Sequence, residues 1–375
     1  MPPRSLPRLA AASLLLAALA ASPARADDLT AALIAAQQWT AAPALAALEI
    51  RGGVVTREAV VGRRRSDDSE PARLDDVWAT GSDGKPMTAA LIARLVDRGL
   101  LRWDAPLAEL LPALRPAMRP EYRAVTLAQL LSHRAGLPRD TADLAFFASF
   151  FADTRPLPEQ RLAYVDRALR EAPVAAPGGP ANYSNTGFVL AGVIAEHVTG
   201  RSYEDLMQRE VFTPLAMTSA RFAPTHDGQP RGHRDGAPST ARFTAAEHGN
   251  PPMFAPAGAE LHLTLRDWAR FCADQLAGAR GRGGLLSRDS YARLLGERPG
   301  EPALGWGVQP GIAGRQGPVL LHAGSDGNWF AFVVLFPAAA TGVLIASNAG
   351  ESMGGEAAAT ALLAALLPEL SPPAP

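Results

Sequence analysis

The chain has 375 residues and a formal net charge of −1, from 36 Lys and Arg against 37 Asp and Glu, so its charge predicts no nucleic-acid partner. Apolar residues make up 47% of the chain and charged residues 19%, which is typical of a globular protein with a large core. The single cysteine, Cys272, excludes an intramolecular disulfide and any cysteine-rich zinc or iron–sulfur site.

Residues 1–26 have the pattern of a secretory signal peptide. Arg4 and Arg8 precede an apolar stretch, 9–21, and Ala24-Arg25-Ala26 places small residues where a signal peptidase reads them. The stretch is shorter than the roughly 20 residues that span a membrane, although a buried N-terminal helix is an alternative. No cysteine follows it to carry a lipid anchor, so we expect a periplasmic or secreted protein without a transmembrane anchor in the mature chain.

The first predicted elements are two strands and a helix. Leu45–Ile50 and Val54–Val61 flank Arg51-Gly52-Gly53 in the manner of a hairpin. From Met87 onward apolar residues recur at three- and four-residue steps, which predicts a helix from Ser82 to about Leu100. Further helices are predicted at 127–131, 144–152, 159–170, 186–198 and 203–212. Nothing between 87 and 215 alternates like a strand, so the middle of the chain is predicted to be helical.

The rest of the chain returns to strands after a long segment without periodicity. That segment, 219–256, is long for a loop in a compact domain, which favours a functional role. A helix is predicted at 265–276 and an Ala-rich helix at 353–367, and residues 371–375 are predicted to be disordered. Between the two helices, strands are predicted at 304–308, 318–322, 329–336 and 342–347.

Strands at both ends of the chain therefore flank a helical middle. Segments so far apart share one core only if the two ends of the chain come together. We predict an α/β (α+β) fold in which a discontinuous domain, 27–80 and 257–370, holds an antiparallel sheet flanked by helices. An all-helical lobe, 81–256, is inserted into that domain. The chain length also favours two lobes.

One lysine is singled out by the composition. Of the 36 basic residues 35 are Arg, and the only Lys is Lys85. Arg keeps its proton at any accessible pH, whereas a desolvated Lys can lose it. Ser82 lies three residues earlier at the start of a predicted helix, within reach of the amine. The pair predicts a serine nucleophile with its base, at a helix end that favours an oxyanion; a stray surface lysine is the alternative.

Two later segments offer the remaining parts of such a site. In an extended Tyr183-Ser184-Asn185 the phenol and the carboxamide point the same way, so both would face one cleft. The alternative is a packing role for Tyr183 and an N-cap role for Asn185. His322-Ala323-Gly324-Ser325 ends a predicted strand, where a backbone N–H would complete an oxyanion hole with that of Ser82. Taken alone, His322 is more often a structural histidine.

Other chemistries fit the sequence less well. Gly81 to Lys85 suggests a phosphate-binding loop, but Ala79 stands where its first Gly is required and Pro86 where Ser or Thr is required. Metal-binding side chains occur in the long loop, although a solvated polar loop is favoured there: His226, Asp227, His233 and Asp235. We predict no metal and no cofactor.

The motif order resembles that of the penicillin-recognising serine hydrolases: Ser-x-x-Lys, then Tyr-x-Asn, then a late His- or Lys-led tripeptide ending in Gly. The likeness is to the class C β-lactamase branch, which also holds D-alanyl-D-alanine carboxypeptidases and esterases. It covers most of residues 43–367, with these further segments: Thr88–Ile92, Leu127–His133, Gly136–Pro138, Pro214–Met217 and Pro256–Gly258.

The resemblance implies a role for each motif residue. Ser82 would be acylated, with Lys85 and Tyr183 sharing general-base work and Asn185 holding the substrate's carbonyl. The N–H groups of Ser82 and Ser325 would form the oxyanion hole, and His322 and Gly324 would line the strand side of the cleft.

Two departures from the family pattern concern the substrate and the nucleophile. The Lys-Thr-Gly of true β-lactamases is His322-Ala323-Gly324, which lacks a permanent cation and a hydroxyl for a substrate carboxylate. Asp83-Gly84 fills a spacer that commonly has a small hydroxyl residue before Lys, so Asp83 adds an unexpected charge and Gly84 would loosen the helix start.

We therefore expect an exported serine hydrolase that forms an acyl-enzyme on Ser82 and acts on a small ester, amide or peptide. A D-alanyl-D-alanine carboxypeptidase or a β-lactamase is an alternative within the same class. A catalytically silent module that binds peptidoglycan or a partner is an alternative of another class. Such a module has no need for Ser82, Lys85 and Tyr183 together, and this favours the enzyme.

The first prediction concerns processing. Cleavage after Ala26 makes Asp27 the first residue of the mature protein, because small residues precede that bond after a short apolar run. N-terminal sequencing of the protein recovered outside the cytoplasm of its host checks this. Intact protein starting at Met1, found only in the cytoplasm, would contradict it.

Overall fold

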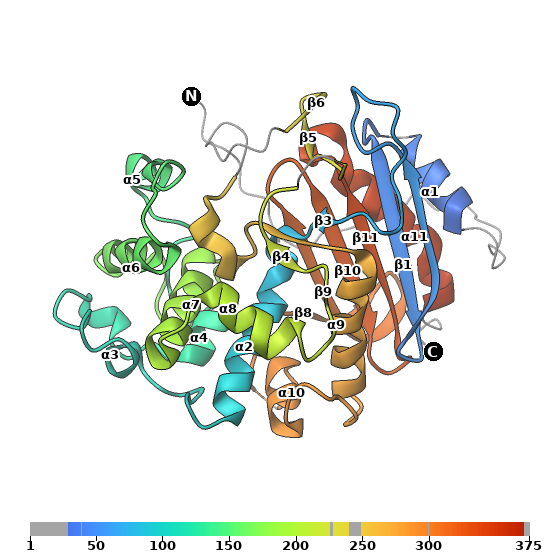
Figure 1. The fold of residues 1–375 in the computed structure, drawn as a ribbon. Helices are drawn as coiled ribbons and strands as arrows, with labels where there is room; N and C mark the ends of the chain where they lie inside the picture. The colour runs from blue at the N-terminus through green and yellow to red at the C-terminus, as the bar shows by residue number, and fades with distance from the viewer. Residues whose placement is uncertain (1–28, 39, 226–227, 240–248, 299, 371–375) are drawn as a thin grey trace.

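A central antiparallel sheet organises the chain. The computed structural model describes residues 29–38, 40–225, 228–239, 249–298 and 300–370, so the predicted signal peptide and the predicted disordered tail lie outside the described residues. The sheet has six strands in the order β2-β1-β11-β10-β9-β8 (Figure 1). Its strands are β1 (Ala44–Arg51), β2 (Val54–Gly62), β8 (Gly307–Ile312), β9 (Arg315–Ser325), β10 (Phe330–Phe336) and β11 (Thr341–Ser347).

The two ends of the chain meet in this sheet. β1 pairs with β11, with Leu48 opposite Leu344, so the predicted sharing of one core by distant strands is confirmed. Side chains alternate between the two faces, as the strand geometry requires. Leu45 and Ile345 pack under α1 (Leu29–Gln37) and α11 (Gly355–Leu370), which cover one face. Leu48 and Leu344 belong to the larger core on the other face, together with α9 (Leu265–Gly278).

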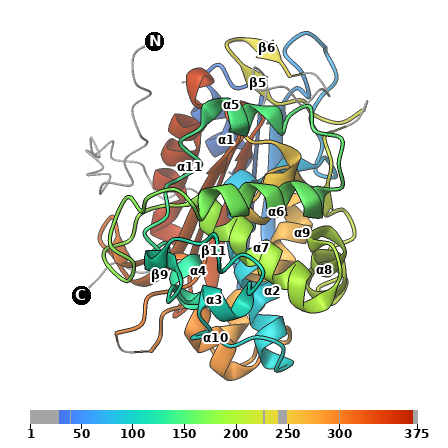
Figure 2. The same cartoon turned by 90° about the vertical axis from the view of Figure 1, so that its left-hand side faces the viewer.

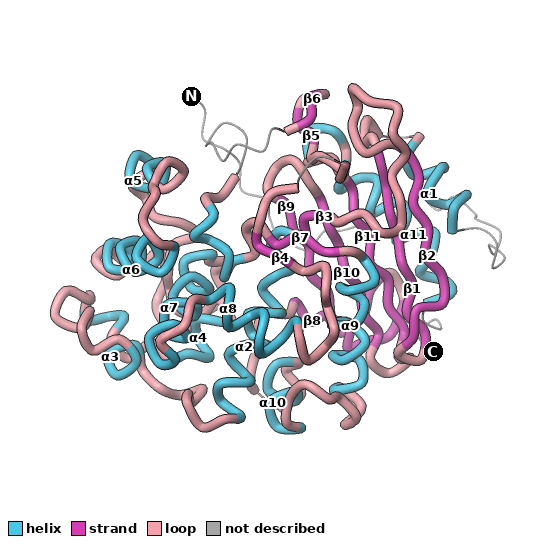
Figure 3. Tube along the Cα trace, viewed as in Figure 1, coloured by secondary structure: helices cyan, strands magenta, loops and turns pink. Residues whose placement is uncertain are grey.

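The remaining helices form the other half of the molecule (Figure 2). α2 (Gly84–Asp97) is buried along most of its length, with Met87, Leu91 and Leu95 fully covered. The other helices are α3 (Leu107–Leu110), α4 (Leu127–Leu131), α5 (Leu144–Ser149), α6 (Leu157–Ala168), α7 (Asn185–Thr199), α8 (Tyr203–Met207) and α10 (Arg288–Leu294), of which α7, α8 and α10 pack against α2. Residues 87–215 are all described and contain no strand of a sheet, as predicted (Figure 3).

Short elements are where the sequence prediction differs from the structure. The segment 219–256, predicted without regular structure, contains β4 (Arg221–Phe222), β5 (His233–Arg234) and β6 (Ala237–Pro238). β4 joins β7 (Leu261–Leu263) and β3 (Trp78–Ala79) in a second sheet that leads directly to Ser82. Strands of two or three residues are too short to show a period. α1, α3 and α10 were also not predicted, and no helix of the described residues has the length and apolar character to cross a membrane.

Candidate active site

Ser82 lies in a tight turn that is pressed against strand β9. The turn, a 3-10 helix at Gly81–Asp83, follows β3 and precedes α2. Gly324 of β9 has no room for a side chain, because a Cβ there would lie 1.9 Å from Thr80 O and 2.7 Å from Ser82 N. Gly81 has φ +51°, and a Cβ on it would lie 2.7 Å from Ser325 N. The two glycines therefore allow the backbone N–H groups of Ser82 and Ser325 to lie close together.

The amine of Lys85 is buried beside the hydroxyl of Ser82. Its Nζ lies 2.9 Å from Ser82 Oγ and donates to Ala257 O at 2.7 Å. Burial lowers the pKa of Lys85 well below its usual value, and the cation of Arg139 lowers it further, whereas Asp140 and Asp83 oppose the shift. A neutral amine at this distance can accept the proton of a serine hydroxyl.

Tyr183 contacts the same oxygen from the other side. Its hydroxyl donates to Ser82 Oγ at 2.7 Å, and burial raises the pKa of this phenol to about 12, so it keeps its proton at neutral pH. The ring of His133 stacks on Tyr183, with 4.5 Å between the centroids. Ser184 N donates to His133 Nδ1 at 3.0 Å, and burial lowers the pKa of this histidine to about 3. His133 thus supports the phenol as a neutral ring.

Asn185 makes a contact that the sequence did not predict. It is the first residue of α7, and its Nδ2 donates to Asp140 Oδ1 at 3.0 Å. The N-cap role considered for it belongs to Ser184, whose hydroxyl accepts from Gly187 N at 3.1 Å. The carboxamide is 3% exposed and has a protein partner.

His322 is more buried than a residue lining an open cleft would be. It is 8% exposed, and its Nδ1 lies 3.0 Å from Ala323 O and 3.2 Å from Asp83 Oδ1. Burial lowers the pKa of His322 to about 3, with the neighbouring Lys85 and His133 acting in the same direction. His322 therefore brings no positive charge to the strand side of the site at neutral pH.

Sequence reasoning missed a permanent cation beside the proposed site. The guanidinium carbon of Arg139 lies 5.2 Å from the centroid of the Tyr183 ring, and its side chain is 47% exposed. Nε of Arg139 lies 3.6 Å from Asp140 Oδ2. Arg139 and Asp140 directly follow Gly136-Leu137-Pro138, one of the segments that carried the family likeness. Their position next to this segment could have identified them as candidate site residues.

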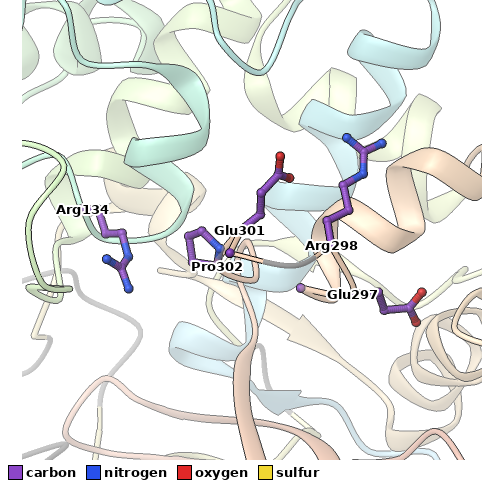
Figure 4. A pocket seen from close by; sticks show the side chains of 7 residues that line it. Arg134, Glu297, Arg298, Glu301 and Pro302 are labelled. Carbon is purple, nitrogen blue, oxygen red and sulfur yellow. The ribbon is translucent and has the colours of Figure 1, made fainter.

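Two other candidate regions do not contribute to this cluster. An open hollow of about 400 Å³ contains no predicted site residue (Figure 4) and is lined by Arg134, Gly296, Glu297, Arg298, Gly300, Glu301 and Pro302. Of the four metal-binding side chains considered in the long loop, His226 and Asp227 lie outside the described residues. His233 is not solvated as expected but buried, with its ring nitrogens 2.8 Å from Asn348 O and 3.0 Å from Ser66 N. No group of three metal-binding side chains occurs among the described residues.

The site contains a serine that contacts a buried lysine and a tyrosine, and it lies between the sheet and the helical half. This arrangement is typical of a serine hydrolase of the Ser-x-x-Lys type. The family model described as Beta-lactamase matches residues 30–367. The chain belongs to the β-lactamase family, and the resemblance inferred from its motifs is confirmed.

Individual relatives within this family are distant in sequence. The D-alanyl-D-alanine-carboxypeptidase/endopeptidase AmpH of Escherichia coli is 26% identical over 74% of this chain and 72% of its own length. Esterase EstB of Burkholderia gladioli is 29% identical over 60% of this chain and 63% of its own. The octameric penicillin-binding protein homologue from Pyrococcus abyssi has the same fold, with a TM-score of 0.72, 22% identity, and 92% of this chain and 79% of that chain covered.

Because β9 lies so close to the serine turn, we expect any side chain at Gly324 to disturb this contact. Gly324→Ala places a methyl group against Thr80 O and Ser82 N, so we expect a loss of stability on the order of 1–3 kcal/mol and a fall in activity as the turn shifts. Gly284→Ala is the matched control, because the nearest heavy atom to a Cβ there is 4.0 Å away. Thermal unfolding and esterase rates of both variants check this. Equal effects of the two substitutions would show that the contact with β9 is not tight.

Proposed function

We propose that this member of the β-lactamase family is an exported hydrolase that forms an acyl-enzyme on Ser82 and hydrolyses small esters or amides. The observation that carries the proposal is the position of Ser82 Oγ, 2.9 Å from Lys85 Nζ and 2.7 Å from the hydroxyl of Tyr183. The export rests on the sequence of residues 1–26 alone.

The geometry supports one order of proton transfers. Lys85, neutral because it is buried, accepts the proton of Ser82 as the oxygen attacks the substrate's carbonyl. The N–H groups of Ser82 and Ser325 stabilise the oxyanion, and the phenol of Tyr183 donates a proton to the leaving group. Lys85 returns its proton to the tyrosine, so the proton lost by Ser82 is balanced by the one on the leaving alcohol or amine. Water then releases the acyl group by the reverse sequence.

The strand side of the site favours an uncharged substrate. A buried substrate carboxylate costs several kcal/mol unless a cation or a hydrogen-bond donor meets it. Ala323 is neither, and His322 is neutral and directed toward Asp83 and its own strand. A short uncharged ester makes no such demand, and its alcohol leaves more easily than an amine. The similarity to an esterase supports the same choice.

A second candidate is a D-alanyl-D-alanine carboxypeptidase that acts on peptidoglycan peptides. The guanidinium of Arg139, half exposed beside Tyr183, is a permanent cation that a substrate carboxylate would meet on the helical side of the site. The similarity to AmpH supports this candidate as well. The two candidates differ in the substrate but share the chemistry of Ser82.

Substitution of the nucleophile and its base tests the mechanism. Ser82→Ala abolishes covalent labelling by a fluorophosphonate and lowers kcat on the order of 10⁴-fold or more, because only the attacking hydroxyl is lost. Lys85→Arg is almost as damaging although it keeps the charge, because a guanidinium cannot accept the proton of Ser82. Mass spectrometry of the labelled peptide and steady-state kinetics are the measurements.

The matched control for the serine is Ser290→Ala, which removes a buried hydroxyl that donates to Asp97 at the C-terminal end of α2. This variant should label normally. Near-normal activity of Lys85→Arg would show that Lys85 is not the base, and labelling of another residue would remove Ser82 as the nucleophile.

The substrate preference is tested by a ratio of rates. We expect measurable hydrolysis of p-nitrophenyl acetate or butyrate and poor hydrolysis of penicillins and cephalosporins, because the strand side lacks a partner for their carboxylate. The measurement is kcat/KM for both substrate types on the purified mature protein. A ratio that strongly favours the β-lactams would reverse the esterase preference and leave the Ser82 mechanism in place.

A further inference from the structure

The carboxyl group of Asp83 is buried in a way that the proposed mechanism does not use. Asp83 directly follows the proposed nucleophile and stands at the N-cap of α2, yet its side chain makes no capping hydrogen bond. Aspartate is a favoured N-cap residue because its carboxylate accepts from the first free N–H groups of a helix. Here the side chain has no exposed surface, and neither oxygen has a hydrogen-bond partner among the described residues. The carboxyl group is therefore directed into the protein and away from the helix.

The contact that Asp83 does make joins the nucleophile turn to strand β9. Its Oδ1 lies 3.2 Å from Nδ1 of His322, whose side chain is 9% exposed. His322 lies three residues before Ser325 on the same strand. Gly324, between them, is the position at which a Cβ would reach Thr80 O, Ser82 N and Asp83 N. The contact thus lies beside the place where the two proposed oxyanion donors meet.

An ionised carboxylate in this position would conflict with the role of Lys85. A buried anion without hydrogen bonds costs several kcal/mol, and a negative charge two residues from Lys85 would stabilise its ammonium form. Burial raises the pKa of Asp83 well above its usual value, with Lys85 opposing the shift. Burial likewise keeps His322 neutral, by lowering its pKa to about 3. The site therefore favours an uncharged pair over an ion pair.

The groups around the pair come from every neighbouring element. Asp83 interacts electrostatically with Lys85 on α2, with Cys272 on α9 and with Tyr183 before α7. His322 interacts with Lys85 and with His133, which follows α4. The charges of Arg139 and Asp140 act on Lys85 from the turn before α5. Burial raises the pKa of the Cys272 thiol, whereas an anion at Asp83 would raise the proton affinity of both Lys85 and His322.

On the basis of the proposed acylation of Ser82, we propose that Asp83 is a neutral carboxylic acid and that its contact with neutral His322 positions the nucleophile turn against β9 without placing an anion beside Lys85. Asp83 is then a positioning residue whose uncharged form is the active one. This differs from a carboxylate–histidine pair in a catalytic triad, in which the carboxylate stays ionised. Ionisation of Asp83 at alkaline pH would hold the proton on Lys85 and lower the rate.

Isosteric and apolar substitutions separate charge from contact. Asn matches the shape and the neutral charge of the acid, so Asp83→Asn should lower kcat/KM for p-nitrophenyl butyrate by less than about threefold at about pH 7. Asp83→Leu keeps the branched shape of the side chain but makes no polar contact, so it should lower kcat by about 10- to 100-fold with little change in KM. Asp83→Asn should also lack the fall in rate at alkaline pH. A loss of more than about 100-fold in folded Asp83→Asn, or equal rates for the two variants, would overturn the proposal.

The charge of Asp83 can be tested by measuring how the stability of the protein depends on pH, an experiment that needs no substrate. If the folded pKa lies above the unfolded value of about 3.9, the folded state binds the extra proton, so the unmodified protein loses stability as the pH rises from about 4. The Tm of Asp83→Asn minus that of the unmodified protein should therefore increase between about pH 4 and about pH 8. An ion pair with protonated His322 would keep the difference flat or decreasing between about pH 4 and about pH 6, because the histidine is then charged in both the folded and the unfolded state, and would raise it only above about pH 6.5. A difference that does not increase between about pH 4 and about pH 6 would refute the neutral pair.

A control variant and an infrared measurement complete the test of the charge of Asp83. Asp274→Asn is the matched control, because Asp274 is a buried carboxyl that accepts from Tyr291 Oη and Gly284 N, and its loss should only destabilise. If Asp83→Asn does not fold, the infrared carbonyl band of a protonated aspartic acid in the unmodified protein at neutral pH decides instead, and its absence overturns the proposal. Failure of the fluorophosphonate to label Ser82 would refute the proposed function, whereas the stability difference would still report the charge of Asp83.

Discussion

The burial of one amine beside one hydroxyl is the interaction on which the candidate site depends. Lys85 has no exposed surface, and the free energy of desolvating its ammonium form lowers the pKa of the amine well below its usual value. The surroundings preserve this condition: Ala257 O accepts from the amine, and the nearest histidine rings are uncharged. A carboxylate close to Nζ would remove the effect, because it would restore the proton. The surroundings of Lys85 therefore favour its neutral form.

The packing that buries Lys85 comes from three distant parts of the chain. α2 lies between the sheet and α7, the Ala257 segment closes the site from one side, and β9 closes it from the other. Gly84, which the sequence suggested would loosen the helix start, has a different role. A Cβ at this position would lie 3.0 Å from the Cα of Gly258, so Gly84 allows two backbone segments to touch beside the amine. The loss of helix propensity at one residue is offset by closer packing around Lys85.

The parts of the site that the sequence predicted are those with a local signature. Ser82 and Lys85 share a helix face, and a single lysine among arginines marks that face, so their contact could be predicted from spacing. Tyr183 could be placed by the family motif. The directions of Asn185 and His322 could not, because each is set by a partner from another segment, Asp140 and Asp83 respectively. In the same way, the long strands and amphipathic helices were predictable, whereas the two-residue strands β3 and β4 exist only through pairing with β7.

The pairing of β1 with β11 has a consequence for the order in which the molecule assembles. The serine turn is made early in synthesis and β9 very late, so the groups proposed to hold an oxyanion meet only when nearly the whole chain is available. Contacts between segments this far apart are slow to form, since much chain entropy is lost before they are gained. A nascent or truncated chain without β9 to β11 thus carries the serine and the lysine but no sheet to press against them. The groups proposed for acylation therefore come together only after β9 to β11 have been made.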